Sequence, residues 1–172
     1  MCNLTQGFTL SGCKDGIGGL LEVYFIERGN VTSYVKASGN VTAITKASGK
    51  RFYKYELQRN TAEFKENIEG NADNGTVTVK QELSIILNRL DVSTRNEILL
   101  LAKNNLWIAI KNRNGLFQLM GEQLGADLTA GESGPGKAGT DRSGHSLTFS
   151  AEEPELAPFI GTAAAAALTT PG

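Results

Sequence analysis

The segment Thr61–Leu87 reads TAEFKENIEGNADNGTVTVKQELSIIL, and its alternation of polar and apolar residues decides the fold. Apolar residues recur at alternate positions in both halves, which is the period of a half-buried strand. The halves are joined by a stretch that ends in Asn74-Gly75, a strong signal for a tight turn. We therefore predict a long antiparallel hairpin with one mostly apolar and one polar face. The polar face is formed by Glu63, Lys65, Asn67, Glu69, Thr76, Thr78, Lys80 and Glu82.

Further strands are predicted wherever short β-branched and aromatic runs are bounded by turn residues. A ten-residue unit occurs twice in succession, as GNVTSYVKAS and then GNVTAITKAS, and is typical of a local hairpin (residues 29–48). One helix is predicted, with its N-terminal cap at Asp91 and its end at Lys103 and Asn104. The other expected strands are residues 20–26, 52–57, 106–110, 116–120 and 146–150.

Composition and length favour a single globular domain. The chain has 172 residues, of which 40% are hydrophobic and 20% charged. The order of elements shows no β-α-β alternation, so we predict a mainly β fold, a β-sandwich or small barrel with one packed α-helix. This domain is expected to cover residues 1–160. Residues 161–172 are expected to form an alanine-rich C-terminal tail, for which the alternatives are a mobile, frayed end, which we favour, and a short helical turn.

Charge and the ends of the chain restrict the function. A net charge of -1 disfavours a dedicated nucleic-acid binder, which would usually be strongly basic. No secretory signal and no run of apolar residues long enough for a membrane span is evident. We therefore expect folding in a cytoplasm without a membrane partner, where Cys2 and Cys13 are reduced. The alternative is a Cys2–Cys13 disulfide in a protein that is later released from the cell.

No group of residues makes a convincing catalytic, metal or cofactor site. One His and two Cys nearly exclude most zinc sites. Asp141, Ser143 and His145 are neighbours in one loop, and neighbours rarely converge as a nucleophilic triad. The adjacent carboxylates of Glu152-Glu153 would point to opposite faces of a strand, which does not suit glycoside hydrolysis. We expect no enzyme activity, no metal and no cofactor.

Several packing and turn motifs occur in a characteristic order along the chain. They are CNLT (2–5), CKDGIGG (13–19), VYF (23–25), FYKYEL (52–57), the long hairpin, LLLA (99–102), residues 121–127 and GHSLTF (144–149). This order resembles a group of virion proteins from tailed phages of Bacteroidetes hosts and, at the level of element order, the phage tail tube fold. The resemblance covers roughly residues 1–160. The duplicated unit and the alanine-rich tail depart from it.

The resemblance implies a subunit of a hexameric ring. In such tubes, hairpins from neighbouring chains join edge to edge into one barrel, and the rings stack into a conduit for DNA. Its partners would be other copies of itself, other tail or neck proteins, and DNA that passes without specific binding. The protein would then be located in the virion after assembly in the host cytoplasm.

Two features of the predicted hairpin suit a subunit of such a ring: its long edges and its polar face. A long unpaired edge is an association hazard unless another chain pairs with it. The eight polar residues would line the channel, where glutamates outnumber lysines and would let DNA slide rather than grip it. The alternative is an ordinary solvent-exposed sheet face. The turn at 70–75 and the Gly-rich loop at 131–144 are candidates for contacts between rings.

Two other functions remain open. The chain could be another virion component, such as a head decoration, collar or adaptor protein that binds a capsid or portal. It could also be a carbohydrate-binding adhesin module in which Tyr53, Tyr55 and Trp107 stack on sugars. Aromatic residues in strands more often pack across the sheet, which weighs against this second alternative.

Overall fold

The structure is a computed structural model, which describes residues 7–8, 16–73, 75–88, 91–137 and 143–170. Cys2 and Cys13 lie outside these residues. A 3-10 turn, η1 (Arg28–Asn30), follows the first strand. The strands are β1 (Leu20–Glu27), β2 (Val31–Ala37), β3 (Asn40–Lys46), β4 (Tyr53–Glu56), β5 (Ala62–Asn71), β6 (Thr76–Leu87), β7 (Leu106–Asn112), β8 (Phe117–Met120), β9 (Asp127–Gly134), β10 (Gly144–Glu153) and β11 (Phe159–Ile160). The helices are α1 (Val92–Lys103) and α2 (Thr162–Thr169).

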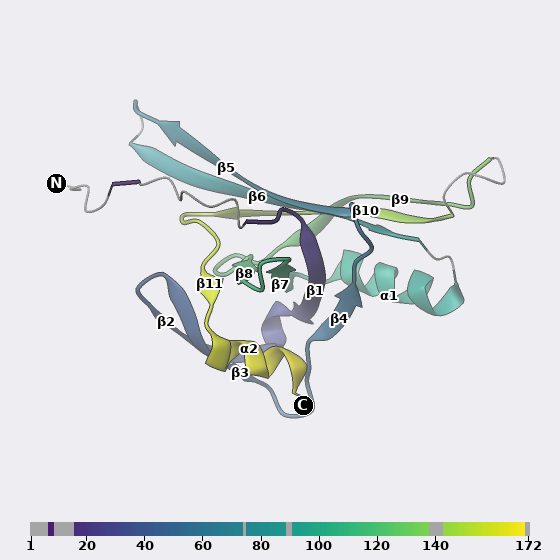
Figure 1. Ribbon diagram of the computed structural model, residues 1–172, viewed down its shortest axis with the longest axis horizontal. Helices are drawn as coiled ribbons and strands as arrows, with labels where there is room; N and C mark the ends of the chain where they lie inside the picture. The colour runs from purple at the N-terminus through teal and green to yellow at the C-terminus, as the bar shows by residue number, and fades with distance from the viewer. Residues whose placement is uncertain (1–6, 9–15, 74, 89–90, 138–142, 171–172) are drawn as a thin grey trace.

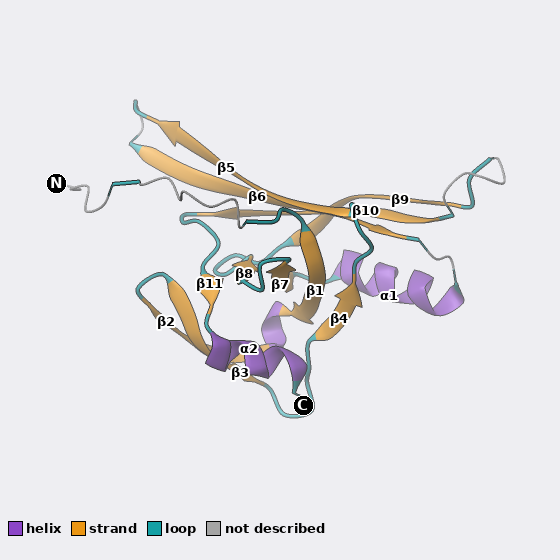
Figure 2. Cartoon of the chain, viewed as in Figure 1, coloured by secondary structure: helices purple, strands orange, loops and turns teal. Residues whose placement is uncertain are grey.

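The strands form two sheets that pack as a β-sandwich (Figure 2). Sheet A has seven strands in the order β2-β3-β11-β8-β7-β1-β4, and sheet B has four in the order β5-β6-β10-β9. The predicted mainly β fold is therefore confirmed as a sandwich, and neither sheet closes into a barrel. The predicted long hairpin is β5–β6, and the duplicated unit forms the β2–β3 hairpin.

Sheet A is the middle layer of the molecule, and both of its faces are buried. Val23 and Phe25 of β1 belong to the core between the two sheets. Tyr24 and Ile26, which alternate with them, belong to a second core on the opposite face. This explains why residues 106–110 of β7 read LWIAI without alternation, since every one of them is buried.

Strand β1 of sheet A crosses sheet B from one edge to the other. Leu20, at the start of β1, borders a hollow shared with residues of β5. Phe25 stacks against Phe149 of β10, with ring centroids 5.1 Å apart. At the end of β1, Glu27 lies opposite Leu106, which forms a bridge with the residue just before β9. One end of β1 therefore lies beside β5 and the other beside β9.

The two helices cover different parts of the sandwich. Helix α1 begins as predicted, because the Asp91 carboxylate accepts a hydrogen bond of 2.7 Å from the Thr94 backbone N–H. It buries Leu101 in the core between the sheets. The alanine-rich segment, in contrast, is no frayed tail in its described part. It forms α2, whose Ala164 and Leu168 are buried against the outer face of sheet A.

The Gly-rich stretch predicted as a loop over 131–144 begins and ends in strands. β9 continues to Gly134 and pairs with β10, which starts at Gly144. Residues 138–142 lie outside the described part. The sequence AGESG has low β propensity, and pairing with β10 imposes the extended conformation.

Gly144 and Gly134 are cross-strand partners and give a matched test of backbone packing. A Cβ on Gly144 would lie 2.1 Å from the Leu87 carbonyl oxygen, whereas nothing lies within 4 Å of a Cβ on Gly134. We expect Gly144→Ala to lower the stability by about 2 to 3 kcal/mol, because backbone must move to admit the methyl group. Gly134→Ala should leave it unchanged. Thermal unfolding of both variants measures this, and equal melting temperatures would contradict it.

Candidate functional site

The eight polar residues of the predicted hairpin share one exposed face of sheet B. The register pairs Lys65 with Glu82 and Asn67 with Lys80, so the polar side chains of both strands project to the same side. The opposite side carries Phe64 and Leu83 toward the core. We call this exposed side the polar face. Its predicted members are Glu63, Lys65, Asn67, Glu69, Thr76, Thr78, Lys80 and Glu82.

β9 and β10 extend the polar face beyond the residues that the sequence predicted. Thr148 of β10 lies beside Ser84 of β6, with their hydroxyl oxygens 3.4 Å apart. Glu152 lies opposite Lys80, and Glu132 of β9 joins the same face through its partner Ser146. The alternation in SLTFS could have revealed the contribution of β10. Glu132 gave no such signal, because it lies in the presumed loop.

Both edges of sheet B are open within the described residues. β5 pairs with β6 and β9 pairs with β10, and among the described residues neither has a hydrogen-bonded strand on its other side. All three pairings within the sheet are antiparallel, so β5 and β9 run in opposite directions. A second copy in the same orientation could thus place its β9 beside β5 and continue the antiparallel alternation.

The far end of the β5–β6 hairpin exposes apolar side chains on its inner side. Figure 1 shows the hairpin projecting beyond the rest of the sandwich. Ile68 and Val77 lie on the side that buries Leu83 closer to the core, yet they are 63% and 60% exposed. Among the described residues, this part of the hairpin therefore has little apolar cover.

A network of buried polar groups fixes the turn that leads into β9. The Glu153 carboxylate accepts hydrogen bonds from the backbone N–H groups of Gln123 and Leu124. Lys36 of the duplicated hairpin lies 2.8 Å from Glu122, a carboxylate that is only 5% exposed. Burial lowers the pKa of Lys36, but its hydrogen bonds to Glu122 and Glu155 outweigh this and leave the pKa raised. These contacts hold the turn that precedes β9, the open edge strand.

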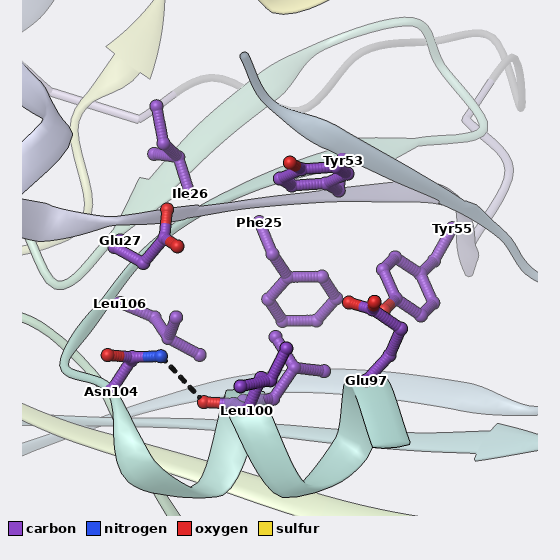
Figure 3. A pocket seen from close by; sticks show the side chains of 10 residues that line it. Phe25, Ile26, Glu27, Tyr53, Tyr55, Glu97, Leu100, Asn104 and Leu106 are labelled. Carbon is purple, nitrogen blue, oxygen red and sulfur yellow. Dashed lines mark hydrogen bonds between the residues drawn. The ribbon is translucent and has the colours of Figure 1, made fainter. Parts of the chain in front are cut away.

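A separate pocket of about 120 Å³ lies between α1, β1 and β4 (Figure 3). Phe25 and Leu101 line it together with Tyr55, whose ring meets Phe25 edge to face at 5.0 Å. Two carboxylates, Glu27 and Glu97, also belong to its lining. Burial raises the pKa of the Tyr55 hydroxyl, and the negative charge of Glu97 raises it further.

The three aromatic residues proposed for sugar stacking do not form one platform. Tyr53 and Tyr55 lie opposite Phe25 and Val23 and share their face of sheet A. Trp107 lies on the other face, is 2% exposed, and donates its indole N–H to the Glu122 carbonyl. Tyr55 packs against Phe25 of the neighbouring strand, as aromatic residues in strands usually do.

Of the three residues considered for a nucleophilic triad, the structure describes Ser143 and His145. His145 is buried at the start of β10, and its Nε2 has no hydrogen-bond partner among the described residues. Asp141 lies outside the described part of the chain.

Comparisons of the chain with protein-family models, curated proteins and solved structures give no match. Within the described residues, no helix has the length and apolar character needed to cross a membrane.

Proposed function

We propose that this protein is a structural subunit of a bacteriophage tail tube, which assembles into stacked hexameric rings that conduct DNA. The sequence resemblance suggests the class of tail tube proteins, and the geometry of the four-stranded sheet B supports assembly into a ring. Its strands can continue from one copy to the next in antiparallel order, so that a ring of copies would form one closed barrel. Catalysis plays no part in this role.

The two open edges of sheet B carry the proposal. A contact between β5 of one copy and β9 of the next joins two different surfaces, and such contacts produce rings when the rotation closes. Closure would satisfy the unpaired backbone groups of both edges at once. It would also offer the exposed Ile68 and Val77 a neighbouring copy to pack against.

The polar face would line the channel of such a ring. Glu63, Glu69 and Glu82 outnumber Lys65 and Lys80 there, and one of these lysines already forms an ion pair of 2.9 Å with Glu63. A weakly acidic lining repels phosphate, so DNA would pass without being held.

Negative-stain electron microscopy of the purified chain tests the assembly. We expect rings or tubes of one uniform diameter with a central channel. Material that remains monomeric by light scattering at high concentration would contradict the proposal. A monomer that instead binds capsids would favour the alternative role as a head decoration, collar or adaptor protein.

Reversing the charge of the polar face should make the tubes bind DNA instead of letting it pass. In a variant with Glu63→Lys, Glu69→Lys and Glu82→Lys, we expect tubes to retain short linear duplex DNA, with an affinity that falls steeply with salt. Wild-type tubes should retain none. Closed circular plasmid serves as the control, because it cannot thread into a channel. Retention of the plasmid to the same extent would place the polar face on the outside of the tube.

A further inference from the structure

The pocket between α1, β1 and β4 has the chemistry of a site for a cationic side chain. Figure 3 shows the Phe25 ring between the carboxylates of Glu27 and Glu97, with the Tyr53 ring on one side and Leu100 on the other. Aromatic faces attract ammonium and guanidinium groups, and carboxylates bind them by charge-assisted hydrogen bonds. A volume of about 120 Å³ is several times the roughly 30 Å³ of one water molecule in the liquid, which leaves room for a guanidinium group.

This chain supplies no cation to the pocket within its described residues. No basic residue is part of the lining, and among the ion pairs between described residues none involves Glu27 or Glu97. Glu27 accepts one hydrogen bond, of 2.6 Å, from the Asn30 side chain. The guanidinium of Arg51 lies 5.3 Å from the centre of the Tyr53 ring but does not line the pocket.

Two arginines lie at the opposite end of β1. Arg59 and Arg113 border a hollow beside Leu20, near the β5 edge of the sandwich. Arg113 is half-buried, with its guanidinium packed over Gly19. Arg59 is exposed, and no ion pair between described residues involves it.

The acidic pocket lies at the other end of β1, on the side of β9. Its lining residue Leu106 forms the bridge that precedes β9, and α1, which carries Glu97, contacts β9. A junction between β9 of one copy and β5 of the next would therefore bring the acidic pocket of the first toward the arginines of the second.

We infer that the pocket receives an arginine side chain, that of Arg59, from the neighbouring copy in the ring. The inference rests on the proposed self-assembly. It adds a side-chain contact between neighbouring copies to the backbone pairing of β5 with β9. The guanidinium would enter the pocket that Glu27, Glu97 and the Phe25 and Tyr53 rings line. Each copy would insert its Arg59 at one end of β1 and receive the Arg59 of another copy in the pocket at the other end. Copies could therefore join in one direction only.

A charge-reversal cycle tests this contact. We expect Arg59→Glu and Glu97→Arg each to raise the concentration for half-assembly roughly 10- to 100-fold, the range that corresponds to losing a charge-assisted hydrogen bond. The double variant should recover most of this loss. Lys50→Glu makes the same charge change in an exposed turn and serves as the matched control. Sedimentation velocity measures assembly, and circular dichroism shows that each variant is folded.

Cross-linking provides an independent measurement. In the Arg59→Lys variant, carbodiimide should join position 59 of one chain to Glu97 or Glu27 of another, and mass spectrometry would locate the link. If wild-type rings form but the single variants assemble normally and no such link appears, the inference is wrong while the proposed function stands. If the wild-type chain does not self-associate at all, both are wrong.

Discussion

The Ile68→Pro variant is expected to remain folded as a monomer and to form no rings at concentrations where the wild-type chain is fully assembled. The hydrogen bond of 2.8 Å from the Ile86 N–H to the Thr61 carbonyl shows which residues of β5 are bonded to β6. Ile68 lies out of phase with Thr61, so its backbone groups point toward the open edge. Proline there removes a donor that only a neighbouring copy would use, and edge strands tolerate proline.

The effect is large because a closed ring repeats the same junction at every copy. An acceptor left without a donor costs about 1 to 3 kcal/mol at each junction, and the proline ring adds a steric clash with the incoming strand. Ile68→Thr is the matched control, since it keeps the backbone donor and the β-branched shape. Electron microscopy and light scattering decide the outcome. Rings of Ile68→Pro at wild-type concentrations would show that β5 is not the joining edge.

Phe149→Ala is expected to cause the largest loss of stability among the variants considered. Phe149 is fully buried where sheet A crosses sheet B, and its ring packs against Phe25. Truncation leaves a cavity between the sheets and should cost about 3 to 5 kcal/mol. A domain of this kind has roughly 5 to 15 kcal/mol of stability in total, so the variant would lose much of it.

Phe159→Ala makes the same chemical change at a residue that is 45% exposed. We expect this control to lose about 1 kcal/mol or less, since it removes little buried surface. Urea unfolding followed by the fluorescence of Trp107 compares the two variants. A similar loss for both would mean that the two sheets are not held together at Phe149.

The sequence was most informative where local pattern and tertiary environment agree. The hairpin over β5 and β6 was predictable because one of its faces is solvated and much of the other is buried, which produces an alternation of polar and apolar residues interrupted at Glu66, Gly70 and Gln81. The helix α1 was predictable because Asp91 provides a cap that acts within four residues. The shared polar face followed from the same alternation, and the observed register places all eight residues on it.

The sequence was least informative where burial depends on a distant partner. The alanines of α2 carry no amphipathic pattern, and only the available face of sheet A makes Ala164 and Leu168 core residues. β9 was mistaken for a loop because its glycine-rich sequence becomes a strand only beside β10. The acidic pocket joins Glu27 to Glu97, which are seventy positions apart in the chain, through the packing of α1 on β1.

β11 has a consequence for the order of folding. This two-residue strand links β3 to β8, so the duplicated hairpin joins the rest of sheet A through residues more than a hundred positions later in the chain. During synthesis from the N-terminus, β2 and β3 must wait for β11 to emerge from the ribosome before they gain this neighbour. Sheet A is therefore complete only after translation has passed residue 160, whereas every strand of sheet B has been synthesised by residue 153.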